Sequence, residues 1–130
     1  MTKENYNLET LFKALADRTR LRLISLIGES EVCVCFFVAI LKTSQPKISR
    51  HLAYLRRAGI VAARREGKWM HYRLTEPPDD HAAHIFREVR ASLAEHPQLQ
   101  RDREQLLKVC CAPNLPVQLR RAPRPLGLAA

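Results

Sequence analysis

The chain has 130 residues, and its 22 lysines and arginines outweigh 13 acidic residues, for a net charge of +9. This length fits one domain with its own core, and the basic balance favours a nucleic acid, another acidic partner or a membrane surface. No run of about 18 apolar residues occurs and the N-terminal segment is polar, so we expect a cytoplasmic protein that does not associate with a membrane. Four cysteines there suggest ligands, reactive thiols or core residues.

The N-terminal third predicts three helices. Apolar residues recur at i, i+3, i+4 and i+7 over residues 8–15, which is the spacing of one helix face. Asp17 is a suitable N-cap for a second helix, and Gly28 is a suitable residue to end it. A third, short helix is expected over residues 34–41.

The next segment predicts a turn, a fourth helix and a hairpin. In the turn KTSQPK, Ser44 can cap the fourth helix and Pro46 falls in its first turn, where proline is tolerated. This helix is expected to run to about Arg57. Two β-prone segments then flank residues 66–68, whose Glu-Gly-Lys sequence predicts the turn of a β-hairpin.

The C-terminal part predicts two more helices, over about residues 80–95 and 97–109, and then a tail. The tail is rich in proline and basic, without periodicity, and is expected to be disordered. We therefore predict a DNA-binding and dimerisation domain over residues 1–110 and a tail over 111–130. The element order predicts a mainly α fold with a β-hairpin, a winged helix-turn-helix with a helical pair added at each end.

The fourth helix carries one apolar stripe, formed by Ile48, Leu52 and Leu55, and an opposite polar face. Cations, an amide, hydroxyls and an aromatic ring on such a face can reach DNA phosphates and base edges. A solvated amphipathic helix is the alternative, but the preceding turn and the following hairpin favour DNA. The candidate DNA contacts here are Ser44, Gln45, Lys47, Ser49, Arg50, His51, Tyr54 and Arg57.

The hairpin carries its own basic cluster. Arg64, Arg65 and Lys68 lie near its tip, as expected of a wing that follows a phosphate backbone. Trp69 and Tyr72 are expected to pack beneath the wing. A purely structural β-ribbon is the alternative.

The segment EVCVCFFVAILKTSQPKISRHLAYLRRAGIVAARREGKWMHYRL resembles the ArsR/SmtB family of metal-responsive repressors, especially its arsenic-responsive branch. The resemblance covers about residues 8–93 and is strongest over 31–74. It implies a homodimer, formed through the first helix and the helix after the wing, that binds operator DNA and dissociates when a metalloid binds. It also implies DNA contacts by Gln45, Ser49, Arg50 and His51.

Cys33 and Cys35 are the leading metal ligands. As(III) and Sb(III) prefer thiolates, and two or three suffice because a lone pair occupies the remaining position, whereas zinc or cadmium prefers four ligands. In a regular helix residues i and i+2 point about 200° apart. The beginning of the third helix must therefore be unwound, or must unwind on binding, which would disturb the recognition helix. The alternative is that both cysteines are small core residues.

A third ligand is not obvious. Arsenic-responsive members often carry a third cysteine three residues after the second and an acidic residue directly after it, but Val38 and Phe36 occupy these positions. Either two thiolates suffice, or Cys110 or Cys111 supplies another, which could come from the partner protomer. Those two cysteines could also form a separate metalloid site, be incidental reactive thiols or form a strained vicinal disulfide.

We expect a repressor that As(III), or alternatively Sb(III), releases from DNA. The first rival is a repressor that senses cadmium, lead, zinc or thiol oxidation. Zinc-sensing members of this family carry an Asp-x-His motif, followed further along the same helix by a histidine and an acidic residue. Here Ser92 replaces that histidine, so a polar helix face better explains Asp79, His81, His84 and His96.

An arsenate reductase is disfavoured because no phosphate-binding loop or Cys-x-x-Cys motif surrounds Cys33, so we expect no enzyme. A winged helix that binds only protein is a further alternative.

Overall fold

The computed structural model describes residues 6–111 together with Pro123 and Pro125, without the side chain of Cys111. The predicted tail over 111–130 therefore lies almost wholly outside the described residues, and the domain boundary stays a prediction. The elements follow in the order α1 (Leu8–Leu15), α2 (Arg18–Ile27), β1 (Glu31–Cys33), α3 (Val34–Leu41), α4 (Gln45–Arg57), β2 (Val61–Glu66), β3 (Trp69–Leu74), α5 (Asp80–Ala94) and α6 (Pro97–Cys111).

Helix ends follow the capping residues of the sequence. The Asp17 carboxylate accepts a hydrogen bond from the backbone N–H of Arg20, which confirms it as the N-cap of α2. Gly28 ends that helix with φ of 51°, a left-handed conformation that favours glycine. Asp79 caps α5 in the same way as Asp17, by accepting from the N–H of Ala82. None of the described helices is long and apolar enough to cross a membrane.

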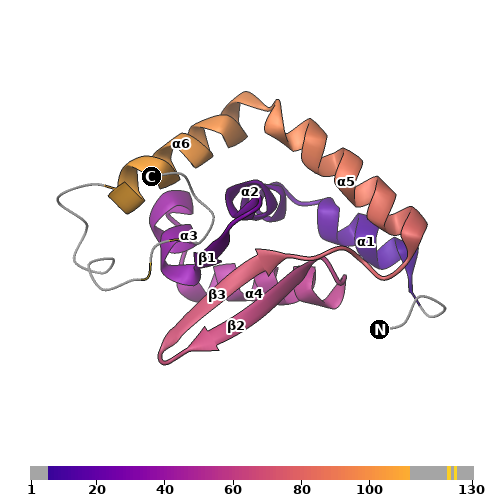
Figure 1. The fold of residues 1–130 in the computed structure, drawn as a ribbon, viewed down its shortest axis with the longest axis horizontal. Coiled ribbons are helices and arrows are strands. Elements are labelled where there is room, and N and C mark those ends of the chain that lie inside the picture. Colours follow the sequence, from indigo (N-terminus) through magenta and orange to yellow (C-terminus); the bar gives the residue numbers. More distant parts are fainter. Residues whose placement is uncertain (1–5, 112–122, 124, 126–130) are drawn as a thin grey trace.

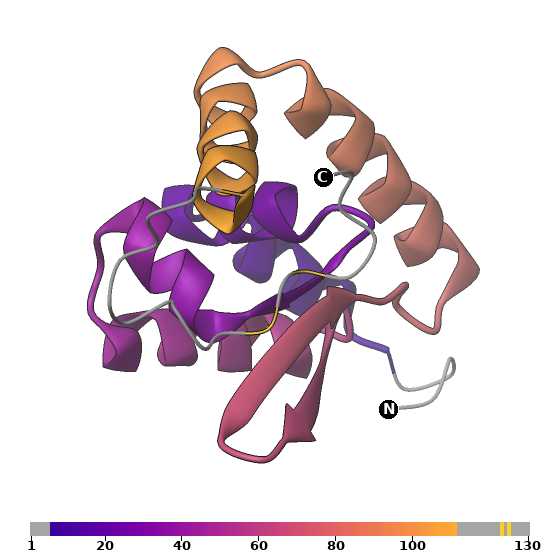
Figure 2. The same cartoon turned by 60° about the vertical axis from the view of Figure 1, so that its left-hand side comes forward.

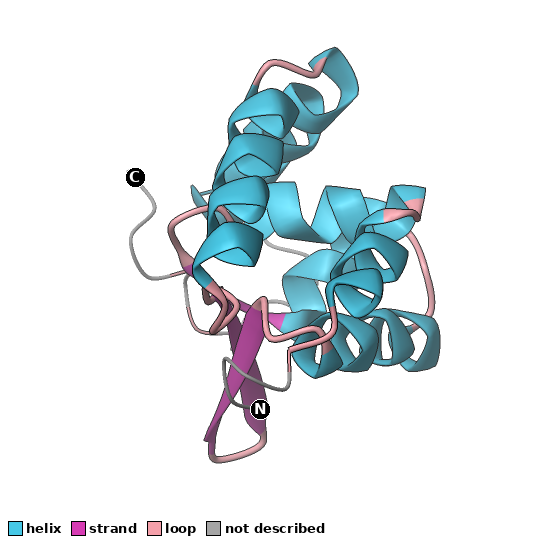
Figure 3. Cartoon of the chain, turned by 90° about the vertical axis from the view of Figure 1, so that its right-hand side faces the viewer, coloured by secondary structure: helices cyan, strands magenta, loops and turns pink. Residues whose placement is uncertain are grey.

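The predicted hairpin is present and forms the wing, which projects away from the helices in Figures 1 and 3. Strands β2 and β3 pair antiparallel from Val61↔Leu74 to Glu66↔Trp69, and Gly67 turns with φ of 59°. The sheet has a third strand that the sequence pattern did not predict. It is β1, which pairs with β3, so the strand order is β1-β3-β2.

The core lies between α4, α2, α3 and the sheet. The predicted stripe of Ile48, Leu52 and Leu55 is fully buried, so α4 directs its other side outward. Tyr72 of β3 is buried with its ring centroid 6.3 Å from that of Phe37 in α3, as the prediction of packing beneath the wing requires. The winged helix-turn-helix fold is thus confirmed.

Helices α5 and α6 form an arch over α2, visible in Figures 1 and 2. The Arg22 guanidinium of α2 donates to both carboxylate oxygens of Asp102 in α6, at 2.8 and 3.0 Å, and only 9% of the Asp102 side chain is exposed. Arg103 donates to the backbone oxygen of Ser25 at 2.9 Å and passes directly over Gly28, where a Cβ would lie 2.5 Å from its Nη1. These contacts fix α6 against α2.

Candidate functional site

Helix α4 presents a continuous polar surface to solvent. Ser44 is its N-cap residue, with extended backbone (φ −61°, ψ 149°), and its hydroxyl makes no capping hydrogen bond within the described chain. Ser44 is thus correctly placed as the cap, although its side chain does not perform the predicted capping. Pro46 lies in the first turn as expected. The exposed predicted contacts on or beside this helix are Ser44, Gln45, Lys47, Ser49, Arg50 and Arg57.

His51 and Tyr54 are only half-exposed, because Arg20 of α2 lies against both. The Arg20 guanidinium is 3.3 Å from His51 Nδ1 and its Cζ is 4.3 Å from the centre of the Tyr54 ring, with Arg57 on that ring at 5.5 Å. Arg20 also donates to the backbone oxygens of Lys13 and Ala14. Sequence reasoning missed Arg20, because a single arginine in α2 gives no sign of its partner in α4.

The three basic residues of the wing differ in their surroundings. Arg65 and Lys68 are exposed, and the Lys68 ammonium lies 5.1 Å from the centre of the Trp69 ring. Arg64 instead donates to the Glu31 carboxylate, from Nε at 2.9 Å and from Nη2 at 2.5 Å, and to Glu66 at 3.2 Å. All three cations are thus exposed, but Arg64 differs from the other two because it is paired with carboxylates.

Cys33 and Cys35 lie at the junction of β1 and α3. Cys33 is the last residue of β1 and the N-cap of α3, with extended backbone (φ −71°, ψ 143°), so α3 begins only at Val34. The predicted need for an unwound helix start is met by the strand, without loss of helical order. The two sulfur atoms are 3.0 Å apart and are not joined by a disulfide. Thiolate bonds of about 2.3 Å from one ion would hold sulfurs ~3–4 Å apart, which is close to this spacing.

Neighbouring hydrogen bonds stabilise a thiolate at Cys33. The Cys35 thiol donates to the Cys33 sulfur, and with backbone N–H groups that include Val34 it lowers the pKa of Cys33 to about 7, although burial acts in the opposite direction. The same shared proton, together with burial and the adjacent Cys33 charge, raises the pKa of Cys35. A position just before a helix N-terminus also favours an anion. Cys33 is therefore the member of the pair that ionises first.

Within the described part of one chain, no other ligand completes a metal site with this pair. No group of three or more His, Cys, Asp or Glu side chains able to hold a metal ion occurs among the described residues. The histidines and Asp79 of the zinc alternative likewise form no such group among the described residues. His71 is the cross-strand neighbour of Cys33 and is buried, and its Nε2 has no hydrogen-bond partner among the described residues.

The second cysteine pair lies at the C-terminal end of α6, the helix of the arch that contacts α3. Cys110 is in the last turn of α6, is 4% exposed, and donates to the backbone oxygen of Leu107 at 3.3 Å. Cys111 closes the helix, but its side chain is not described. Among the described side chains, Cys110 therefore does not join Cys33 and Cys35 in a three-ligand group.

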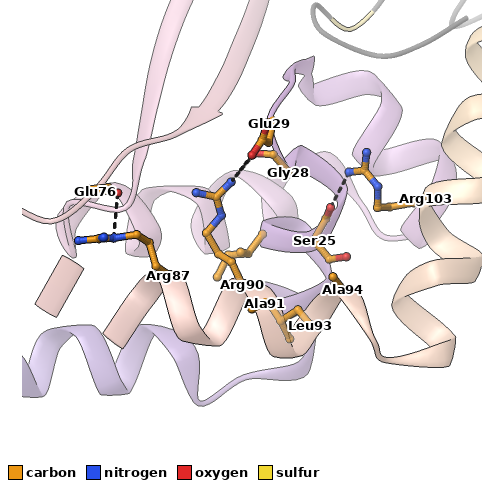
Figure 4. A pocket seen from close by; sticks show the side chains of 11 residues that line it. Ser25, Gly28, Glu29, Glu76, Arg87, Arg90, Ala91, Leu93, Ala94 and Arg103 are labelled. Carbon is orange, nitrogen blue, oxygen red and sulfur yellow. Dashed lines mark hydrogen bonds and ion pairs between the residues drawn. The ribbon is translucent and has the colours of Figure 1, made fainter. Parts of the chain in front are cut away.

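A cavity of about 460 Å³ lies between the end of α2, α5 and α6, and is shown in Figure 4. Its three arginines already have partners. Arg87 lies 3.3 Å from Glu76, Arg90 lies 4.0 Å from Glu29, and Arg103 donates to a backbone oxygen of α2. These contacts attach α5 and α6 to the rest of the fold, and we interpret the cavity as the space left at that junction.

A second groove, of about 410 Å³, separates α1 from α5 and is mostly apolar, with Phe12, Leu15, Leu21 and Val89 among its lining residues. Phe12 is 50% exposed and Leu8, one turn earlier, is 43% exposed. Half of the predicted apolar stripe of α1 is thus on the surface instead of in the core. A contiguous exposed apolar face of this kind marks an interaction surface.

Comparison with known protein families places these features in context. Residues 17–63 match the model for bacterial regulatory proteins of the arsR family. The chain is 52% identical to the arsenical resistance operon repressor of Escherichia coli over 80 residues, which are 61% of this chain and 68% of that protein. It is 58% identical to the arsenic resistance transcriptional regulator ArsR1 of Pseudomonas putida over 65 residues, and it spans about half of that protein's length.

Solved structures show the same fold. HlyU from Vibrio cholerae superposes with a TM-score of 0.55 and 31% identity, over 78% of this chain and 96% of that one. The antimony-specific transcriptional repressor AntR gives a TM-score of 0.54 and 27% identity, over 72% and 80% of the two chains. A homodimeric winged helix-turn-helix DNA-binding domain from Mycobacterium bovis gives 0.55 and 28%, over 70% and 82%. These similar proteins are transcriptional regulators, in agreement with the expectation of a non-enzyme.

Proposed function

The chain belongs to the ArsR family of bacterial transcriptional regulators, and we propose that it is a homodimeric repressor that leaves its operator when As(III) binds to Cys33 and Cys35. The observation that carries this proposal is the 3.0 Å contact between the two sulfurs at the junction of β1 and α3. Similarity to arsenical resistance repressors supports As(III) as the inducer, and similarity to an antimony-specific repressor makes Sb(III) the alternative. A cytoplasmic location is part of the proposal.

DNA binding is proposed to use α4 in the major groove and the wing along the backbone. Arg50 and Gln45 are exposed near the N-terminal half of α4, where a recognition helix reaches base edges. Lys47, Arg57, Arg65 and Lys68 would neutralise phosphates, because each is an exposed cation on the two projecting elements. Ser44 and Ser49 would donate to phosphate oxygens, and His51 and Tyr54 would support this surface from its edge.

The homodimer is proposed to form through α1 and α5. Leu8 and Phe12 are exposed apolar residues on α1, and the groove beside them continues to α5. A second copy would cover this surface by the same residues in a two-fold arrangement. Two copies of α4 could then enter successive major grooves, as the half-site geometry of winged-helix dimers requires.

Binding of arsenite is a ligand exchange. The Cys33 thiolate would displace one hydroxide ion from trihydroxyarsenic(III). Cys35 would then displace a second hydroxide, which leaves as water with the proton that Cys35 loses, so that one hydroxide ion and one water molecule are released in total. The helix supplies no third thiolate, because Phe36 and Val38 take the positions that could have carried acidic and thiol groups. In this proposal the remaining hydroxide completes the coordination, while Cys110 and Cys111 are secondary candidates for a thiolate from the partner protomer or for a separate site.

Thiol oxidation is the second candidate signal. The same sulfur contact and the lowered pKa of Cys33 favour formation of a Cys33–Cys35 disulfide as much as metalloid binding. A divalent soft metal such as cadmium, lead or zinc is less well supported, because a tetrahedral site needs more ligands than the described part of one chain assembles.

The test is fluorescence anisotropy of a labelled operator fragment, titrated with protein and then with arsenite, cadmium or an oxidant. We expect arsenite to weaken DNA binding by roughly 5- to 150-fold. Arg57→Ala should weaken binding without arsenite and lower the salt dependence by about one phosphate contact, whereas Arg101→Ala, the matched loss of an exposed charge on α6, should change both far less. DNA binding that is unchanged in saturating arsenite would exclude the arsenic assignment, and absence of binding at low salt would exclude the repressor.

A further inference from the structure

One wing cation, Arg64, is bound to strand β1, which ends at Cys33 of the proposed metalloid site. Its Nε and Nη2 both donate to Oε1 of Glu31, at 2.9 and 2.5 Å, and Nη1 donates to Glu66 at 3.2 Å. Glu31 is the first residue of β1, and Cys33 is its last. The sensing strand and the wing are thus joined by a direct charged contact.

Strand register shows how this contact is made. Arg64 is opposite His71, His71 is opposite Cys33, and Glu31 is opposite Arg73. Directly opposed residues point to the same face of a sheet, so Arg64, His71, Cys33 and Glu31 share one face. Because β3 lies between β1 and β2, the bridge from Arg64 to Glu31 must cross over β3. It therefore links two strands that share no backbone hydrogen bonds.

The bridge is better sheltered than an ordinary surface ion pair. The side chain of Glu31 is only 12% exposed, although that of Arg64 is 45% exposed. The Arg64 guanidinium donates two hydrogen bonds to this carboxylate. Paired hydrogen bonds between two charged groups are strong and directional. Movement of β1 is therefore transmitted to the guanidinium.

We propose that Glu31 is a positioning residue that couples the metalloid site to the wing by holding Arg64. When Cys33 and Cys35 bind an ion, the three-residue strand β1 shifts, and Arg64 moves with Glu31 relative to the phosphate backbone. The inference rests on the proposed function and adds a second route of control, through the wing, beside the direct connection from α3 to α4.

The protein carries its own reporter for this movement. Trp69 is the sole tryptophan and begins β3, opposite Glu66 at the end of the wing. We propose to compare the full chain with Glu31→Gln, which keeps size but removes the charge. Glu76→Gln is the matched control, because Glu76 is an exposed carboxylate that pairs with Arg87 at 3.3 Å, away from the cysteines.

Without arsenite, Glu31→Gln should increase acrylamide quenching of Trp69 relative to wild type and Glu76→Gln, because the wing loses its tether. With arsenite, the change in Trp69 emission should fall at least about threefold in Glu31→Gln, while ultraviolet absorbance from As–S bonds persists. Arg64→Gln should reproduce this loss, and the double variant should show no further loss, because both substitutions break one interaction.

The outcomes separate the two proposals. Equal acrylamide quenching of Trp69 in wild type and Glu31→Gln overturns the inference, regardless of the response to arsenite. The inference is also overturned if Trp69 emission of the wild type does not change on addition of arsenite, although As–S absorbance appears and DNA is released. That result would leave the proposed function intact. Failure of wild type to bind arsenite or release DNA instead overturns the proposed function, and the quenching comparison then still tests the tether.

Discussion

The two cysteine pairs lie at opposite kinds of helix terminus. Cys33 precedes the N-terminus of α3, where backbone N–H groups and the helix dipole stabilise an anion, whereas Cys110 lies in the last turn of α6, where carbonyl oxygens disfavour one. The sulfur of Cys33 accepts a hydrogen bond from Cys35, whereas that of Cys110 donates to the backbone oxygen of Leu107. The two pairs thus differ in how well they stabilise a thiolate, because the backbone around them differs.

The largest expected difference is in the response to arsenite. Cys33→Ser and Cys35→Ser should each remain bound to operator DNA in saturating arsenite. The weakening of DNA affinity by arsenite, up to about 100-fold in the wild type, should therefore be absent from both variants. The physical reason is that one thiolate cannot chelate the ion. Anisotropy titrations measure this, with circular dichroism to confirm folding. If both variants still release DNA while Cys110→Ser and Cys111→Ser do not, the sensing site is the C-terminal pair.

The ionisation of Cys33 is the second difference. We expect thiolate absorbance in the ultraviolet to rise with a midpoint near pH 7, and Cys33→Ser to remove this transition. Because the pKa of Cys33 is lowered by folding, its contribution to stability is complete above the pKa of the unfolded thiol and is lost as the pH falls through about 7. A first thiolate transition that stays near the value of a free cysteine would show that the pair is not preorganised.

The smallest expected effect comes from α6. Cys110→Ala should lower the free energy of unfolding by about 1 kcal/mol, because it removes a buried sulfur and its hydrogen bond, while leaving the arsenite response at the wild-type level. Urea denaturation and the anisotropy titration measure the two quantities on the same preparation. Loss of the arsenite response in this variant would show that Cys110 contributes a ligand.

Local sequence patterns predicted most of the fold. Periodicity located α1, the capping residues Asp17 and Gly28 located the ends of α2, and the turn sequence located the hairpin. The buried stripe of α4 was also identified correctly, because all these features depend on near neighbours in the sequence. Strand β1 was missed. Three residues carry no usable pattern, and this strand exists because β3, about forty positions later, pairs with it.

The candidate site was only partly accessible to sequence reasoning. Residue type and spacing pointed to Cys33 and Cys35, but the direction of their side chains depended on the missed strand. Arg64 was predicted as a phosphate contact, and its partner Glu31 was not foreseen, because the two are 33 positions apart and meet across a strand. Long-range pairing of charged groups leaves no mark in local composition.

Cys33 has one more consequence, for protein engineering. It is the N-cap residue of α3, and its side chain makes no capping hydrogen bond within the described chain. Serine or aspartate at this position would normally strengthen a helix start by about 1 kcal/mol. A selection for heat resistance alone would therefore favour replacing Cys33, and under the proposed function the more stable repressor would no longer respond to arsenite.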